Sequence, residues 1–292
     1  MLFKKLIEYI NESKFDCVWM SVPEVIEWER ITGFQYGNKD EIYEDITIEE
    51  FLDTIRGEVI NVRQIKSRRI KVIDIAEKEI DVWNAYGCLN AEIQLEDNSY
   101  CLNNGKWYYI NKDFSSKIER EYETIKLSEK DFINYDEATE DEDEYNEKLT
   151  EYLPGAVLIH KIGEIPYGGG RGNKIEMCDI MTADNELIHI KKNGGSSYLS
   201  HLFNQATVSA ELLLEKDFRA KANAKMKEHK FEIGFPDDFV AYKYKIIIGI
   251  INPYHDERPR IPFFSKVSLR YAIREMKKLG YEVELKNIKK IV

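Results

Sequence analysis

The chain has 292 residues, of which 43% are hydrophobic and 33% charged, and its formal net charge is −11. This composition is typical of a globular protein with one large or two ordinary domains. No apolar run approaches the ~18 to 20 residues that span a bilayer, and the N-terminus lacks the apolar core of a secretory signal. The scattered cysteines form no CxxC pair. We therefore expect a cytoplasmic protein with free thiols, no disulfide framework and no membrane partner.

The charge is distributed unevenly along the chain. Residues 151–292 carry 23 Lys and Arg against 18 Asp and Glu, whereas the first 150 residues carry 19 against 35. A local basic surface can bind phosphates even when the total charge is negative. The asymmetry predicts two parts with different partners. We expect one domain over residues 1–130 and another over residues 131–292.

The N-terminal part is predicted to be a mixed α/β domain. Residues 15–23 have the pattern of a strand, and residues 46–55 that of a helix with Thr47 as its N-cap. Residues 70–75 predict a second strand. From residue 89 onward, turn signals separate short strands and predict an antiparallel meander.

Within the meander, Asn104-Gly105 is a strong hairpin signal. The tryptophans of this domain lack interleaved basic residues, so we expect core or interface residues and no base-stacking surface; they are Trp19, Trp28, Trp83 and Trp107. No catalytic pattern is present in this half. We expect the acidic domain to recognise a target or to mediate assembly, with a protein partner or with further copies of the chain.

An acidic run lies near the start of the second domain. Residues 142–152 predict a helix that ends before Pro154-Gly155. The chain then continues as strands over 156–163, 174–181 and 186–192, a long helix that begins at Ser196 or Ser197, a strand over 244–252, a helix over 264–280, and a last strand from 281. The order indicates an α/β sandwich, and the continuous apolar run 244–252 indicates a strand covered on both faces.

One strand pair of this domain carries a chemical pattern. Side chains alternate along a strand, so His189 and Lys191 share a face, and the turn at 183–185 returns the chain beside Asp179. The three side chains can therefore converge across a hairpin. A carboxylate and a second ligand that hold a divalent cation, with an ammonium group that stabilises developing charge, suit a metal-dependent phosphodiesterase. We expect Asp179 and His189 to bind Mg²⁺ or Mn²⁺.

The arrangement resembles the PD-(D/E)XK nuclease core, close to its Mrr-like branch. The shared features are an acid-bearing helix, a strand with Asp, a hairpin to a strand with X-x-Lys, and a helix with Gln. In this sequence they fall on Glu144 or Glu147, Asp179, His189-x-Lys191 and Gln205. The resemblance implies an α/β/α domain with a mixed sheet, in which Asp179 ligates metal, Lys191 orients the nucleophile, and Gln205 and Glu147 support the site.

The sequence departs from that pattern at His189, which stands where the family has an acid. A neutral imidazole binds Mg²⁺ poorly but suits Mn²⁺ and other transition ions. Either the metal preference has shifted, or an acid from elsewhere fills the place, or the site is degenerate. The candidate acids are Glu147, Glu164 and Glu176, although a regular strand places Glu176 on the face opposite Asp179.

Several residues near this pattern are candidate phosphate contacts. They are Arg171 in the glycine-rich loop 168–173, Lys192, and Ser196 and Ser197 at the start of a helix. The loop lacks the Lys-Ser/Thr ending of a P-loop, so we expect no nucleotide there. His201 lies four residues before Gln205 and can share its helix face.

The segments KIEMCDIMT, LIHIKK and GGSSYLSHLFNQATVSAELL, with YGCLNAEIQL upstream, also resemble a sporadically distributed, uncharacterised bacterial family. The resemblance covers nearly all of the chain from about Cys17. Its patchy distribution implies a role in defence against phages or mobile elements. Two hypotheses follow: a metal-dependent endonuclease that acts on DNA more readily than RNA, or a degenerate nuclease-fold module that binds nucleic acid or a partner protein.

Overall fold

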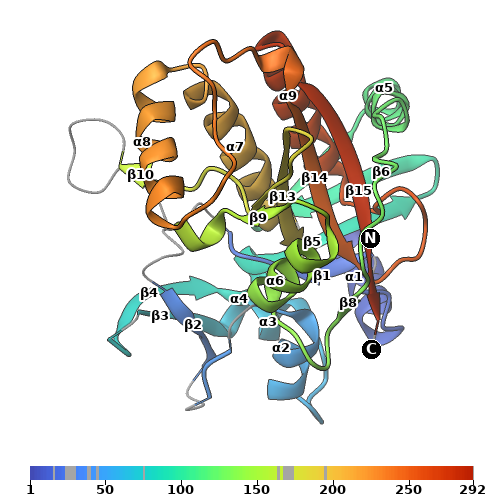
Figure 1. Cartoon of the computed structure of the whole chain (residues 1–292). Helices are drawn as coiled ribbons and strands as arrows, with labels where there is room; N and C mark the ends of the chain where they lie inside the picture. The colour runs from blue at the N-terminus through green and yellow to red at the C-terminus, as the bar shows by residue number, and fades with distance from the viewer. Residues whose placement is uncertain are drawn as a thin grey trace. The chain divides into compact units, whose positions relative to one another are not determined.

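The computed structural model describes residues 1–15, 17–23, 31–37, 41–43, 46–74, 76–162, 165–166, 174–193 and 196–291 (Figure 1). The chain divides into two compact units. The first comprises residues 1–119 with 194–198, and the second comprises residues 120–193 with 199–292. Both are mixed α/β, with antiparallel sheets in the first unit and a mixed sheet in the second, which confirms the predicted class. Among the described helices, none combines the length and apolar character needed to cross a bilayer.

The first unit contains the predicted meander. Its sheet has the order β1-β5-β6-β7 and is antiparallel throughout. The strands are β1 (Val18–Met20), β5 (Leu89–Leu95), β6 (Asn98–Asn103) and β7 (Lys106–Ile110). Asn104 and Gly105 both have positive φ, at 45° and 67°. The Asn-Gly signal therefore identified the hairpin correctly.

Another sheet of this unit has the order β2-β3-β4, formed by β2 (Ile31–Tyr36), β3 (Arg69–Asp74) and β4 (Glu79–Asn84). The helices are α1 (Leu2–Asn11), α2 (Ile48–Thr54), α3 (Val62–Ser67), α4 (Ala85–Cys88) and α5 (Lys112–Glu123). The last turn of α5 belongs to the second unit. Thr47 caps α2 as predicted, because its side chain accepts a hydrogen bond from the Glu50 backbone N–H. Trp83 is buried, Trp19 and Trp107 are half-buried, and Trp28 lies outside the described residues.

The second unit is built on a mixed sheet of order β8-β15-β14-β13-β12-β9. Its central strands, β13 (Glu186–Lys192), β14 (Lys245–Asn252) and β15 (Glu282–Ile291), are parallel. Strand β12 (Ile180–Met181) pairs antiparallel with β13 and with β9 (Val157–Leu158), and β8 (Tyr135–Asp136) runs parallel to β15. Every residue of β14 after its first is buried, as the apolar run predicted.

Helices cover both faces of this sheet (Figure 1). On one face α7 (Ser196–Leu212), α8 (Lys216–Glu228) and α9 (Phe263–Lys278) pack against Ile246, Ile248 and Ile250 of β14. On the other face α6 (Glu142–Tyr152) packs against Ile247 and Ile251. The alternating isoleucines of β14 thus join two cores. The result is an α/β/α layering in the second unit.

The single long helix predicted after residue 196 is wrong, because the structure has α7 and α8 with a break at residues 213–215. Glu215 donates its backbone N–H to Leu212 O, and the Arg219 guanidinium donates to Leu213 O at 2.9 Å. The buried Arg219 side chain therefore donates to a carbonyl that, in a continuous helix, would accept a hydrogen bond from a backbone N–H of the next turn. Local helix propensity gave no sign of this tertiary hydrogen bond.

Two predicted strands are also shorter than expected. Strand 156–163 stops after β9, and residues His160–Ile162 form a 3₁₀ turn, η2. Strand 174–181 is divided into β11 (Lys174–Ile175), which pairs with β10 (Ile165–Pro166), and β12. The backbone N–H groups of Ile159 and His160 both donate to Asp179 O, at 2.7 and 3.1 Å. This shared carbonyl turns the chain away from the ladder.

Gly249 lies where β14 approaches its neighbours most closely. A Cβ at this position would lie 2.9 Å from Ile288 Cδ1 and 3.1 Å from Ile190 Cγ1. We expect Gly249→Ala to lower the free energy of unfolding by about 1–3 kcal/mol, because overpacking forces neighbouring side chains off their rotamers. Gly87→Ala is the control, since a Cβ there meets nothing within 4 Å. Urea unfolding of both variants tests the prediction, and equal stabilities would contradict it.

Candidate functional site

A cavity of about 90 Å³ opens in the second unit, beside the end of β13. Its walls come from α6, η2, the segment 176–179, β13 and α7. The lining residues are Glu142, Asp143, Asn146, His160, Glu176, Cys178, Asp179, His189, Ile190, Lys191 and Gln205. Asp179, His189 and Lys191, which the alternation of the strands was predicted to bring together, therefore line the same space.

The strand pairing fixes the carboxylate of Asp179. Its backbone N–H donates to Ile188 O at 3.0 Å, and its Oδ2 accepts a hydrogen bond from the backbone N–H of Ile190 at 2.6 Å. Burial, together with the nearby charge of Glu176, raises the pKa of Asp179 to about 8. Two carboxylates that disfavour each other's ionisation are stabilised by a cation between them.

Glu176 lies beside Asp179, and the prediction that it occupies the opposite face is wrong. Residues 176–178 are not part of a strand, so the alternation of side chains does not extend to them. The Glu176 carboxylate is half-buried and takes a hydrogen bond from Gln205 Nε2 of α7 at 3.2 Å. Gln205 therefore contacts the site, through Glu176.

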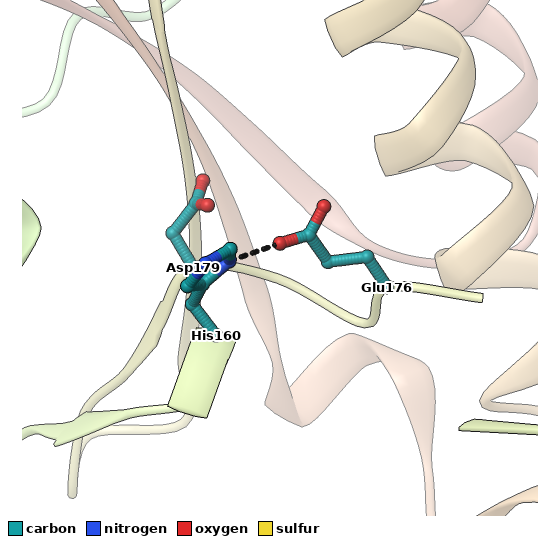
Figure 2. A group of neighbouring side chains, drawn as sticks. All are labelled: His160, Glu176 and Asp179. Carbon is teal, nitrogen blue, oxygen red and sulfur yellow. Dashed lines mark hydrogen bonds and ion pairs between the residues drawn. The ribbon is translucent and has the colours of Figure 1, made fainter. Parts of the chain in front are cut away.

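His160 is one of the residues that sequence reasoning missed. Its Nδ1 lies 2.7 Å from Glu176 Oε1, and its Nε2 lies 3.5 Å from Asp143 Oδ1. Figure 2 shows the side chains of His160, Glu176 and Asp179 gathered at one place. One ligand atom from each of the three lies within 4.8 Å of the others. The sequence gave no signal for this residue, because residues 156–163 have the pattern of a plain strand.

His189 is 3% exposed, and its Nε2 has no hydrogen-bond partner among the described residues. Burial lowers the pKa of His189 to about 4, so the imidazole is neutral at pH 7. A neutral imidazole with a free ring nitrogen can accept a hydrogen bond or bind a metal ion. A buried polar atom without a partner is costly, and an ion or ordered water commonly accounts for it.

Lys191 reaches the cavity from β13 and pairs with the first residue of α6. Its Nζ lies 2.8 Å from Glu142 Oε1, and Glu142 Oε2 accepts the backbone N–H of Lys192 at 2.7 Å. Burial disfavours the charged lysine, but the carboxylate of Glu142 outweighs this and the pKa of Lys191 is raised. The side chain is therefore a fixed positive charge in the cavity wall.

The acids that α6 contributes to the cavity are Glu142 and Asp143, not Glu144 or Glu147. Glu144 forms a capping box with Asp141 at the start of the helix. Glu147 is exposed and does not line the cavity. It lies five positions after Glu142, which is about 140° around a helix of 3.6 residues per turn. Glu147 therefore lies outside the lining of the cavity.

Of the candidate phosphate contacts, the structure describes only the side chain of Lys192. Arg171 and Glu164 lie outside the described residues, as do the side chains of Ser196 and Ser197. The Lys192 ammonium group lies 4.8 Å from the centre of the Tyr135 ring and is not among the cavity-lining groups. The half-buried His201 does not line the cavity either.

The ion pair between His160 and Glu176 predicts a pH dependence of the metal-free protein. The hydrogen bond to Glu176 raises the pKa of His160 to about 9. Protonated His160 therefore makes its full contribution to stability below pH 6.5, the pKa of histidine in the unfolded chain. This contribution is lost as the pH rises through 9. We expect His160→Gln to flatten the fall in melting temperature between pH 6.5 and 9 in the presence of EDTA. His229→Gln, at an exposed position, should keep the wild-type slope.

The fold and site define an α/β protein with a carboxylate, imidazole and lysine cluster that could hold a divalent cation. The model of a family described as a family of unknown function (DUF6119) matches residues 1–289, and the chain belongs to this family. This agrees with the predicted resemblance to an uncharacterised family. Searches of curated proteins and of solved structures gave no match.

Proposed function

We propose that the protein is a divalent-metal-dependent nuclease that hydrolyses phosphodiester bonds of DNA, with RNA as the less favoured substrate. The observation that carries the proposal is the convergence of two carboxylates, Asp179 and Glu176, and one ammonium group, Lys191, on a single cavity. Such a set can bind a cation and a phosphate at the same place.

The layout of the second unit supports a PD-(D/E)XK fold for this domain. Helix α6, the antiparallel strands β9, β12 and β13, helix α7 and the parallel strand β14 follow one another in the order that the resemblance implies. The acid, the lysine and the glutamine come from α6, β13 and α7 respectively. The proposed fold thus accounts for the source of each side chain.

The residues around the cavity fit a divalent ion. Asp179, Glu176 and His160 offer oxygen and nitrogen ligands within reach of one another, and the buried His189 Nε2 is without a partner among the described residues. An ion bound there would supply positive charge to the oxygens of a phosphodiester and favour ionisation of an attacking water. The donor set is therefore compatible with the cofactor expected from the sequence, Mg²⁺ or Mn²⁺.

The remaining side chains have separate roles in the proposed hydrolysis. Water adds to phosphorus, a bridging P–O bond breaks, and the proton passes to the leaving alcohol. Lys191 stabilises the negative charge that develops on phosphate oxygens. Glu142 is a positioning residue that holds the Lys191 ammonium, and Gln205 is a positioning residue that orients Glu176.

The second candidate function is a degenerate nuclease-fold module that binds nucleic acid or a partner protein. The observation in its favour is that His189 replaces an acid two positions before Lys191. Glu176 weakens this alternative, because it adds a carboxylate close to Asp179 in the cavity. The patchy distribution implied by the resemblance supports, for either function, a proposed role in defence against phages or mobile elements. In both cases the acidic first unit would recognise the target, bind a partner protein or form homo-oligomers.

Cleavage assays separate the two functions. Purified protein is incubated with plasmid, linear duplex, single-stranded DNA and RNA, each with MgCl₂ or MnCl₂. Asp179→Ala and Lys191→Ala are compared with matched substitutions at the exposed positions Asp238→Ala and Lys227→Ala. Metal-dependent cleavage that only the first pair abolishes supports the nuclease. Binding without cleavage in every metal supports the module, and cleavage that survives both cavity substitutions refutes the proposed site.

A further inference from the structure

We propose that the cation site of the second unit prefers a transition-metal ion of the Mn²⁺ to Zn²⁺ class over Mg²⁺, with the imidazole of His160 as a nitrogen ligand beside Asp179 and Glu176 and the imidazole of His189 as a further contact of the bound ion or its water. The inference uses the cavity of the proposed nuclease but concerns ion binding alone. It can therefore hold or fail independently of any cleavage.

The spacing of the side chains already approaches that of ligands around one ion. His160 Nδ1 and Glu176 Oε1 are 2.7 Å apart. Two adjacent ligands with metal bonds of about 2.1 Å lie roughly 3 Å from each other, and opposite ligands lie about 4.2 Å apart. The set of His160, Glu176 and Asp179 falls within 4.8 Å. An ion can replace the proton between the imidazole and the carboxylate with small side-chain movements.

A second observation at the same cavity is independent of this cluster. His189 is buried and lines the cavity, and its Nε2 has no hydrogen-bond partner among the described residues. Strand β13 places this ring in the cavity wall beside Lys191, while Ile188 packs into the core beneath α6. An ion held by Glu176 and Asp179 gives this nitrogen a partner, either directly or through a coordinated water.

The chemistry of the donors decides between classes of ion. Mg²⁺ requires oxygen ligands and loses its water reluctantly, whereas imidazole nitrogen suits the transition metals. For a given nitrogen and oxygen site, affinity rises from Mn²⁺ toward Cu²⁺. Gln205 donates to the other oxygen of Glu176, which is the kind of outer contact that orients a metal-binding carboxylate. A set of donors that mixes imidazole nitrogen with two carboxylates therefore selects against Mg²⁺.

Direct binding measurements test the inference on the metal-free full-length protein. Isothermal titration with MnCl₂ and with MgCl₂ should give at least a tenfold lower Kd for Mn²⁺. Electron spin echo modulation of the Mn²⁺-loaded protein should show coupling to ¹⁴N of a coordinated imidazole. His160→Asn should weaken Mn²⁺ binding by at least tenfold and change Mg²⁺ binding much less. His229→Asn, the same substitution at an exposed histidine, should leave both affinities unchanged.

Equal affinities of the wild type for the two ions, or a bound Mn²⁺ spectrum without nitrogen coupling, would overturn the inference without any variant. An unchanged Mn²⁺ affinity in a folded His160→Asn protein would overturn the role of His160. Nitrogen-coupled Mn²⁺ binding without cleavage of any substrate would support the inference and contradict the nuclease. Equal cleavage with Mg²⁺ and Mn²⁺, together with equal affinities for the two ions, would support the nuclease and contradict the inference.

Discussion

The substitution Asp179→Asn is expected to abolish cleavage and, at the same time, to stabilise the metal-free protein. Asp179 is the central carboxylate of the cavity, so its loss removes a ligand whose ion contributes several kcal/mol to the stabilisation of charge. Each 1.36 kcal/mol corresponds to a factor of ten in rate. We expect the single-turnover rate of Asp179→Asn to fall by at least about 10³-fold.

The stabilising effect follows from the cost of the ionised carboxylate. Burial, with the charge of Glu176, raises the pKa of Asp179 to about 8. The pKa of Asp179 is about 3.8 in the unfolded chain. At pH values between 3.8 and 8, the folded state therefore binds the proton more tightly than the unfolded state does. The contribution of Asp179 is therefore favourable at low pH and is lost as the pH rises through 8. Asparagine stays neutral and still offers an oxygen to the backbone N–H of Ile190.

Thermal unfolding in EDTA at pH 6 and pH 9 measures this second effect. Asp179→Asn should melt about 2–4 °C above the wild type at pH 9, which is the shift that 1 kcal/mol gives in a domain of this size. The difference should shrink at pH 6. Asp238→Asn, at an exposed position, controls for the loss of one negative charge. An equal loss of stability at both pH values would show that the Asp179 side chain stabilises the fold and that its ionisation does not destabilise the folded protein.

Removal of the Lys191 charge is expected to lower cleavage by about 10²–10³-fold while ion binding stays within a few-fold of the wild type. Methionine preserves the length of the side chain and removes the ammonium group that faces developing phosphate charge. Losses of this size are typical when one preorganised electrostatic donor is deleted. Single-turnover cleavage and Mn²⁺ titration of Lys191→Met measure the two quantities separately.

The partner of Lys191 requires its own control. Lys191→Met leaves the Glu142 carboxylate, whose side chain is 24% exposed, without its ion pair. An unpaired half-buried charge destabilises a protein, so the double variant Lys191→Met/Glu142→Gln distinguishes a folding defect from a loss of chemistry. The double variant should regain stability and remain inactive. Recovery of cleavage in the double variant would show that the unpaired Glu142 carboxylate, and not the missing ammonium group, causes the loss of cleavage in Lys191→Met.

The elements that local patterns predict correctly are those with strong periodicity or strong end signals. Helix α6 covers the predicted residues 142–152, between the capping box of Asp141 and the Pro154-Gly155 stop, where Gly155 has a φ of 67°. Strands β13 and β14 follow from their apolar runs. The sequence by itself also determined that Asp179, His189 and Lys191 would approach one another, because a short turn and the alternation of side chains leave little freedom.

Tertiary structure alone decided which other side chains join them. His160 and Glu176 enter the cavity because the carbonyl of Asp179 accepts two backbone N–H groups from residues 159 and 160 and residues 176–178 leave the ladder. Helix α6 presents Glu142 because Tyr145 and Leu149 fix its rotation against the sheet. These choices depend on contacts between segments distant along the chain, and such contacts leave no periodicity in the residues that make them.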